Sequence, residues 1–175
     1  LLTNNQKQYY DKAEIPSVVI GAQRFYHSWL QEVNEYFSQN EKSLVINKFI
    51  KNKSVALVLL KNRSGPSAKI FNRDQKYLYK QKIFRTLIEK DFFLIIKPHP
   101  GEDSKQLEND LLSLPSDKYC ISELPAIYLA TLCDCGVFEF PSNSVMDILA
   151  ANKPAYFPII EIIKMIPDLY SGDII

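Results

Sequence analysis

From residue 54 onward, short apolar runs alternate with segments of helical periodicity. The clearest runs are VALVLL at 55–60, FFLII at 92–96 and GVFEF at 136–140. Strands that are apolar on both faces are typical of a parallel sheet covered by helices on both sides. Helices between successive strands supply the right-handed crossovers that such a sheet needs. The sequence therefore predicts an α/β fold, a Rossmann-like parallel sheet with helices on both faces.

The N-terminal part of the chain has a different pattern. Between residues 22 and 50, aromatic and aliphatic side chains recur at helical spacings. We therefore divide the chain into a helical or linker segment, 1–53, and a Rossmann-like domain, 54–175. In that domain we expect further strands at 119–122 and 154–157, and helices at 75–90, 106–112, 125–132 and 145–152. The helix at 75–90 is expected to bury Leu78, Ile83, Leu87 and Ile88.

Composition and charge exclude several classes of protein. The net charge is +1 and the lysines and arginines are scattered, whereas nucleic-acid-binding domains usually carry a basic excess, so we expect no nucleic-acid partner. No apolar run approaches the roughly 18 residues of a membrane span, and the polar N-terminus does not resemble a signal peptide. The chain begins with Leu1 and ends on apolar Ile174 and Ile175, which suggests a piece of a longer protein.

The three cysteines point to no metal site and no disulfide framework. They are an odd number, without framework spacing, and free thiols fit a reducing cytoplasm. The sequence Cys133-Asp134-Cys135 is not a Cys-x-x-Cys pair, so we expect the two thiols to chelate a metal poorly. We interpret both as small buried hydrophobic residues. We expect neither a metal nor a cofactor.

Polar residues follow three of the expected strands. The carboxyl ends of parallel strands meet at one edge of a sheet, where ligands of such folds bind, so we expect these loops to converge. The first loop carries Lys61, Arg63 and Ser64, whose basic and hydroxyl groups suit a diphosphate. It contains neither a Walker motif nor a dinucleotide fingerprint. An ordinary solvated loop is an equally open interpretation.

The second loop displays a histidine between two prolines, in the sequence Lys97-Pro98-His99-Pro100. The prolines cannot continue a strand, so they should present His99 rigidly at the end of the strand. An imidazole in this place can donate a hydrogen bond to a phosphate oxygen or a leaving group. The alternative is a surface histidine in a turn.

The third loop, Ser142-Asn143-Ser144, precedes an expected helix. The first amides of a helix lack backbone partners and carry partial positive charge, so they suit a phosphate, to which the serine hydroxyls can add donors. Helix N-capping is the alternative, although it accounts for only one of these polar residues. We expect His99 and Ser144 to face one cleft.

The order of these motifs resembles a known family. A strand ending in Lys97-Pro98-His99-Pro100, then a further strand, Ser142-Asn143-Ser144 and a helix leading to Lys153-Pro154, is similar to the C-terminal domain of GT-B-type glycosyltransferases. The similarity is greatest to the bacterial surface-polysaccharide group. That group includes capsule Kdo-transferases, bacterial sialyltransferases and polysialyltransferases, and CDP-glycerol glycerophosphotransferases. The resemblance covers residues 54–158.

The resemblance implies an enzyme that transfers a sugar or polyol from a CMP- or CDP-activated donor to a glycan or glycolipid. His99 would be the catalytic contact to the departing phosphate, and Glu139 a contact to ribose or base. The acceptor domain that supplies the base is not recognisable in residues 1–53. The expected location is the cytoplasm, including association with the inner face of the membrane. Together with the first loop, the expected donor site comprises Lys61, Arg63, Ser64, Lys97, His99, Pro100, Glu139, Ser142, Asn143 and Ser144.

Two other interpretations stay open. One is a non-catalytic nucleotide-binding or scaffold module, because no acidic base is evident in the N-terminal part. The other is an epimerase or phosphorylase of the same architecture, which would use a uridine donor. The sequence does not identify the sugar, the acceptor or the oligomeric state.

Overall fold

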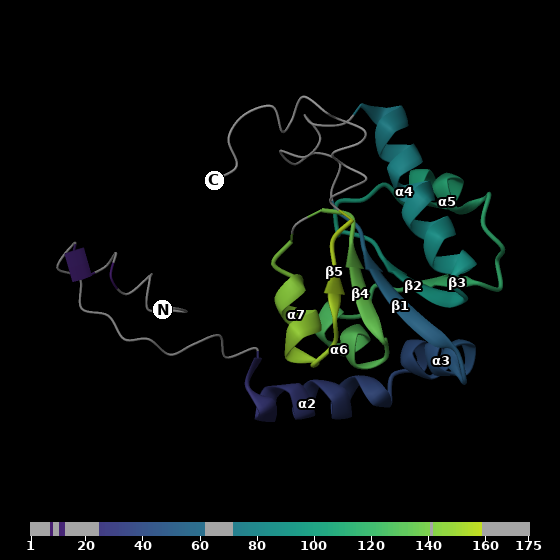
Figure 1. Ribbon diagram of the computed structural model, residues 1–175. Helices are drawn as coiled ribbons and strands as arrows, with labels where there is room; N and C mark the ends of the chain where they lie inside the picture. The colour runs from purple at the N-terminus through teal and green to yellow at the C-terminus, as the bar shows by residue number, and fades with distance from the viewer. Residues whose placement is uncertain (1–7, 9–10, 13–24, 62–71, 141, 159–175) are drawn as a thin grey trace. The chain divides into compact units, whose positions relative to one another are not determined.

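The computed structural model describes residues 8, 11–12, 25–61, 72–140 and 142–158 (Figure 1). The contacts divide the chain into two compact units, Leu1–Gln39 and Asn40–Ile175. The first unit contains helix α2 (His27–Ser38). The second begins with helix α3 (Glu41–Ile50), in which Ile46 is buried and Phe49 stacks on Phe93 of the sheet. The division therefore falls inside the 1–53 segment, and α3 packs with the sheet.

The second unit is built on a parallel sheet of five strands in the order β3-β2-β1-β4-β5, which confirms the predicted fold. Helices α4 and α5 lie on one side of the sheet, and α6 and α7 on the other (Figure 1). The strands are β1 (Ser54–Leu59), β2 (Phe92–Lys97), β3 (Tyr119–Ile121), β4 (Cys135–Phe138) and β5 (Ala155–Tyr156). The helices are α4 (Arg73–Glu89), α5 (Ser104–Leu111), α6 (Ala126–Thr131) and α7 (Val145–Ala150).

The strand order changes direction at β1. From β1 the chain builds outward through β2 to β3, then returns to the other side of β1 to form β4 and β5. Connections therefore leave β1 and β4 in opposite directions, which makes the region beyond their carboxyl ends a topological switch point. Ligands of open α/β sheets bind at such a switch point.

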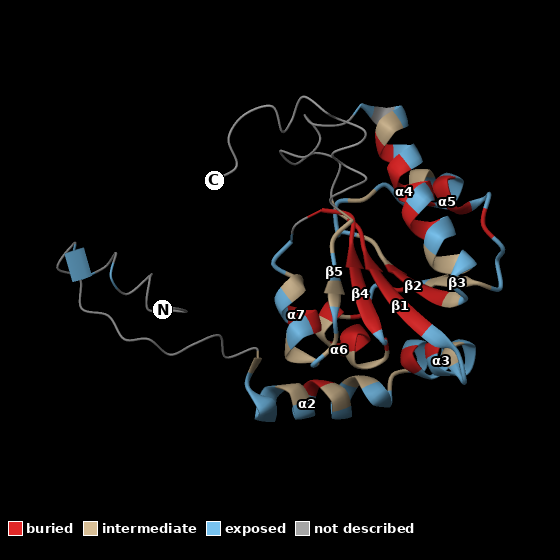
Figure 2. Ribbon diagram, viewed as in Figure 1, coloured by how far each residue is buried: buried red, intermediate tan, exposed pale blue. Residues whose placement is uncertain are grey.

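The central strands are apolar because both of their faces are covered. Every residue of β1 after Ser54 is buried, and so are the four middle residues of β2. Figure 2 shows this buried centre, with the edge strands β3 and β5 less covered. Large side chains from α4, among them Tyr79 and Phe84, complete the core on one face. Truncating a large apolar core side chain typically lowers the free energy of unfolding by about 2–5 kcal/mol. The packed centre therefore holds the strands, and the loops at their ends, in fixed positions.

A glycine lets α7 approach the sheet. A Cβ atom on Gly136 would lie 2.6 Å from Cγ1 and 2.7 Å from Cδ1 of Ile148, a fully buried residue of α7. These distances are too short for any real contact. The absence of a side chain at Gly136 therefore sets how close α7, and with it the turn at 142–144, lies to β4.

The cysteines behave as structural residues. Cys133 and Cys135 are buried with free thiols, and Cys135 begins β4, as their interpretation as small hydrophobic residues predicted. Burial raises the pKa of the Cys133 thiol to about 12, so the thiol stays protonated at neutral pH. Among the described residues, no group of three or more His, Cys, Asp or Glu side chains is placed to hold a metal ion. The described helices include none long and apolar enough to cross a membrane.

Candidate functional site

The carboxyl ends of β2, β1 and β4 lie side by side. The amide of Leu60 donates to the carbonyl of Lys97 at 3.0 Å, and the amide of Glu139 donates to the carbonyl of Leu59 at 3.1 Å. The loops that start at Lys61 and Lys97 and the turn at 142–144 therefore begin at one edge of the sheet, as the parallel topology predicted. Arg63 and Ser64 lie outside the described residues.

Glu139 joins the end of β4 to the end of β1. Its Oε2 accepts a hydrogen bond of 2.8 Å from the amide of Lys61, and its side chain is fully buried at 0% exposure. Its other oxygen, Oε1, is buried and has no hydrogen-bond partner among the residues that the structure describes. Burial raises the pKa of this carboxyl, while Lys80, the Lys61 amide and Lys76 act in the opposite direction. The carboxylate expected to contact ribose or base thus holds the start of the first loop and offers no surface to a ligand.

His99 stands in a tight, exposed turn. The carbonyl of His99 accepts from the amide of Glu102 at 2.8 Å, and its Nδ1 accepts from the amide of Gly101 at 3.1 Å. An Nδ1 that accepts carries no proton, so Nε2 bears the proton of the neutral ring. The turn thus selects one tautomer and leaves Nε2–H as the donor of an exposed side chain, which suits contact with an anionic oxygen.

Lys97 is drawn away from the β1 side of the edge. Its Nζ donates to the carbonyl of Glu123 at 3.2 Å, and burial lowers the pKa of Lys97, while the Glu123 carboxylate opposes that shift. Lys97, His99 and Pro100 line a cavity of about 420 Å³ on the β3 side, together with Glu102, Glu108 and Glu123. Residues 142–144 do not line this cavity, so the expected single cleft for His99 and Ser144 is not formed by it. The carboxylate of Glu102 is buried against Lys80, but Glu108 and Glu123 are exposed, and their negative charges make the cavity unfavourable for a phosphate.

The turn at 142–144 is organised by its own hydrogen bonds. The Ser144 amide donates to Ser142 Oγ at 3.3 Å, and Ser142 Oγ donates to Ser144 Oγ at 3.4 Å. Ser144 occupies the N-cap position of α7 but its side chain makes no capping bond, so N-capping by Ser144 does not explain the motif. The side chains of Ser142 and Asn143 are exposed.

The amides at the start of α7 are already used. Those of Val145, Met146 and Asp147 donate to the carbonyls of residues 142, 143 and 144, each at 3.1 Å. The expectation that these first helical amides are open to a phosphate is therefore corrected. The apolar residues indicated a helix that begins at residue 145, but the carbonyls of residues 142–144 already accept hydrogen bonds from its first amides. What the turn presents is its exposed Ser142 and Asn143 side chains.

Sequence reasoning missed a buried ionic cluster beneath this edge. Lys80 of α4 is 1% exposed, and its Nζ lies 2.6 Å from Oε1 of Glu102 and 3.5 Å from Oδ2 of Asp110. Lys76 is also buried, whereas Leu78, expected to face the core, is 59% exposed. The buried face of α4 thus includes two lysines. Apolar periodicity predicts that lysines of a helix face solvent, so it does not reveal them. We refer to Lys80, Glu102 and Asp110 as the Lys80 cluster.

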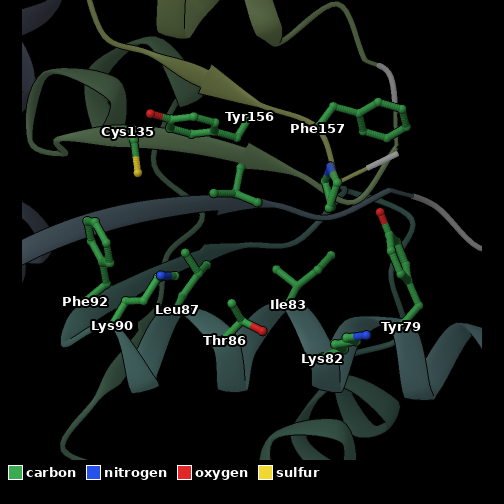
Figure 3. Close-up of a pocket in the computed structure, with 12 residues that line it drawn as sticks. Tyr79, Lys82, Ile83, Thr86, Leu87, Lys90, Phe92, Cys135, Tyr156 and Phe157 are labelled. Carbon is green, nitrogen blue, oxygen red and sulfur yellow. The ribbon is translucent and has the colours of Figure 1, made fainter. Parts of the chain in front are cut away.

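A larger cavity, of about 510 Å³, lies on the α4 face of the sheet between that helix and β4 and β5 (Figure 3). Its wall is mainly apolar, with Ile83, Leu87, Phe92 and Phe157 among its residues. It runs along the sheet and contains none of the expected site residues. Its chemistry favours an apolar occupant and not a nucleotide phosphate.

Comparison of the sequence with protein-family models and with curated proteins found no match. What the edge can bind is therefore inferred from its own residues. Of the expected donor-site residues, the structure describes the edge positions Lys61, Lys97, His99, Pro100, Glu139, Ser142, Asn143 and Ser144.

Proposed function

We propose that the carboxyl edge of β2, β1 and β4 binds the phosphate of a nucleotide-activated sugar or polyol, as the donor domain of a glycosyltransferase. The observation that carries the proposal is the switch point between β1 and β4. The His99 turn lies on one side of it and the turn at 142–144 on the other. Ligand sites in open α/β sheets form at this position, and both turns carry polar side chains.

In this proposal the phosphate lies on the β1 side of His99, away from Glu108 and Glu123 of the neighbouring cavity. Nε2–H of His99 donates to a phosphate oxygen, and the exposed side chains of Ser142 and Asn143 add donors from the other turn. Donors that are fixed before the reaction stabilise charge that grows on a departing phosphate. His99 is thus the proposed catalytic contact, and these protein donors neutralise the phosphate.

The remaining parts of the proposal come from the resemblance to the surface-polysaccharide glycosyltransferases. They are a cytidine-nucleotide donor, a glycan or glycolipid acceptor, an acceptor domain that supplies the base, and action in the cytoplasm at the membrane. No residue of the described edge selects cytosine by its position. Nucleotide choice is therefore measured separately from phosphate binding.

Calorimetry with cytidine, CMP, CDP, UDP and GDP tests the proposal. We expect CMP and CDP to bind more tightly than the other nucleotides. His99→Ala should weaken CMP and CDP binding about tenfold to a hundredfold, the equivalent of losing a charge-assisted hydrogen bond, and should leave cytidine binding nearly unchanged.

The matched control is His27→Ala, which removes the other histidine of the chain, exposed in α2. It should leave all affinities unchanged. Unchanged CDP binding in His99→Ala would remove His99 from the site. Equal losses for cytidine and CMP would show that His99 contacts the nucleoside and not the phosphate.

A further inference from the structure

The Lys80 cluster stands out because charged side chains are rarely buried. The side chains of Lys80, Glu102 and Asp110 are each 1% exposed. Removing charges from water is unfavourable, and an ion pair in this setting is weak evidence for added stability. A buried ion pair does fix the relative positions of the segments that carry it, because either partner alone would be strongly disfavoured. The question is therefore which segments this cluster holds together.

A continuous series of contacts leads from Lys80 to the imidazole of His99. Lys80 Nζ holds Oε1 of Glu102 at 2.6 Å. Glu102 closes the turn that His99 opens, since its amide donates to the His99 carbonyl at 2.8 Å. Inside that turn, the Gly101 amide donates to Nδ1 of His99 at 3.1 Å and so leaves the proton on Nε2. Glu102 is thus held through both its backbone and its side chain.

The far side of the cluster is anchored in helix α5. Asp110 lies 3.5 Å from Lys80 Nζ, and its Oδ1 accepts from Gln106 at 2.9 Å. The side-chain amide of Gln81, the neighbour of Lys80 in α4, donates to the Asp110 carbonyl. Two helices therefore fix the lysine that fixes Glu102.

Lys80 also acts on the other part of the edge. The Glu139 carboxylate, which holds the Lys61 amide, interacts electrostatically with Lys80 and with Glu102. Lys80 thus influences the Glu139 carboxyl electrostatically and contacts Glu102 of the His99 turn directly. No residue of the cluster was among those expected to contact a ligand.

We propose that Lys80 is a positioning residue, which through Glu102 holds His99 in the turn and tautomer that present Nε2–H to the ligand of the edge. The effect of Lys80 on nucleotide binding rests on the proposed function. The effect of Lys80 on the His99 turn does not, so the two effects can be tested separately. Lys80 itself contacts no nucleotide in this proposal.

The test compares Lys80→Met, Glu102→Gln and the wild-type chain by NMR without nucleotide, then by CDP calorimetry. Lys82→Met is the matched control, because Lys82 is an exposed lysine of the same helix. In the wild type we expect ¹⁵N shifts of an unprotonated Nδ1 and a protonated Nε2 in His99, and slow exchange of the Gly101 amide. Lys80→Met should speed that exchange at least tenfold, lose the tautomer signature and weaken CDP binding at least tenfold. Lys82→Met should change none of these.

The results for Lys80→Met and Glu102→Gln distinguish the positioning role of Lys80 from the proposed function. A folded Lys80→Met chain with the wild-type His99 signature and Gly101 exchange would overturn the positioning role. If Lys80→Met does not fold, Glu102→Gln decides by the same two measurements, because it keeps the side-chain shape and removes the charge. Loss of the His99 signature in a chain whose wild type binds no CDP would support the positioning role and contradict the proposed function.

Discussion

The His99 turn and the turn at 142–144 are expected to serve the same phosphate, yet they are held by different means. The His99 turn is tied to two helices through the buried Lys80 cluster. The turn at 142–144 relies on hydrogen bonds within itself and on the packing of α7 over Gly136. One edge of the sheet therefore combines two kinds of support. The ion pairs of the Lys80 cluster hold the His99 turn, and we call them the charge anchor. The close packing of α7 on Gly136 holds the turn at 142–144, and we call it the shape anchor. The two anchors should fail in different ways.

Breaking the charge anchor should have the largest effect. Lys80→Met leaves the carboxylates of Glu102 and Asp110 buried without their cation, so we expect it to lower the free energy of unfolding by about 3–5 kcal/mol. Urea denaturation measures this loss, with Lys82→Met as the unaffected control. Adding Glu102→Met and Asp110→Leu should restore most of the stability, because the unpaired charges are then gone. A triple variant as unstable as Lys80→Met would argue that the lost packing, and not the charges, is responsible.

Breaking the shape anchor should cost less. Gly136→Ala places a methyl group against Ile148, so we expect a loss of about 1–3 kcal/mol as α7 moves away from β4. Ile148→Ala removes the obstruction but leaves a cavity. Because the two residues touch, the double variant should be more stable than the sum of the single losses predicts. Additive losses in urea denaturation would contradict the close packing of α7 on Gly136.

The link that Glu139 makes between the ends of β4 and β1 should appear as a pH dependence. Burial raises the folded-state pKa of Glu139 above its ordinary value of 4.5, so between these two values the folded chain holds a proton that the unfolded chain has lost. The contribution of Glu139 to stability is therefore present below pH 4.5 and declines as pH rises through the folded pKa. Glu139→Gln lacks this decline, so its stability relative to wild type should rise with pH across that window. A pH-independent difference between the two unfolding curves would show that the buried carboxyl does not titrate as described.

The fold follows from the sequence more completely than the site does. VALVLL at 55–60 and FFLII at 92–96 are apolar on both faces because helices cover both, and this pattern alone predicts the parallel sheet. The parallel topology then brings the loops after β1, β2 and β4 to one edge. Each of these inferences uses only local periodicity and the rules of strand connection.

The details of the edge depend on contacts between residues distant in sequence. Lys80 reads as a solvent-facing residue of a helix, and only the fold shows that Glu102 and Asp110 lie around it. Glu139 reads as a ligand contact, but the amide that it binds belongs to Lys61. A signal was present in the polar residues on the buried face of α4, although periodicity cannot distinguish a paired buried lysine from an exposed one.

The central claim is that nucleotide phosphate binds at the switch point, between the two turns. The most direct test is titration of the ¹⁵N-labelled chain with CDP while the backbone amide shifts are followed. The account predicts the largest shifts at Lys61, at residues 99–102 and at residues 142–145, with little change along the apolar cavity. Shifts concentrated at Ile83, Thr86 and Tyr156, which line that cavity, with none at His99, would contradict it.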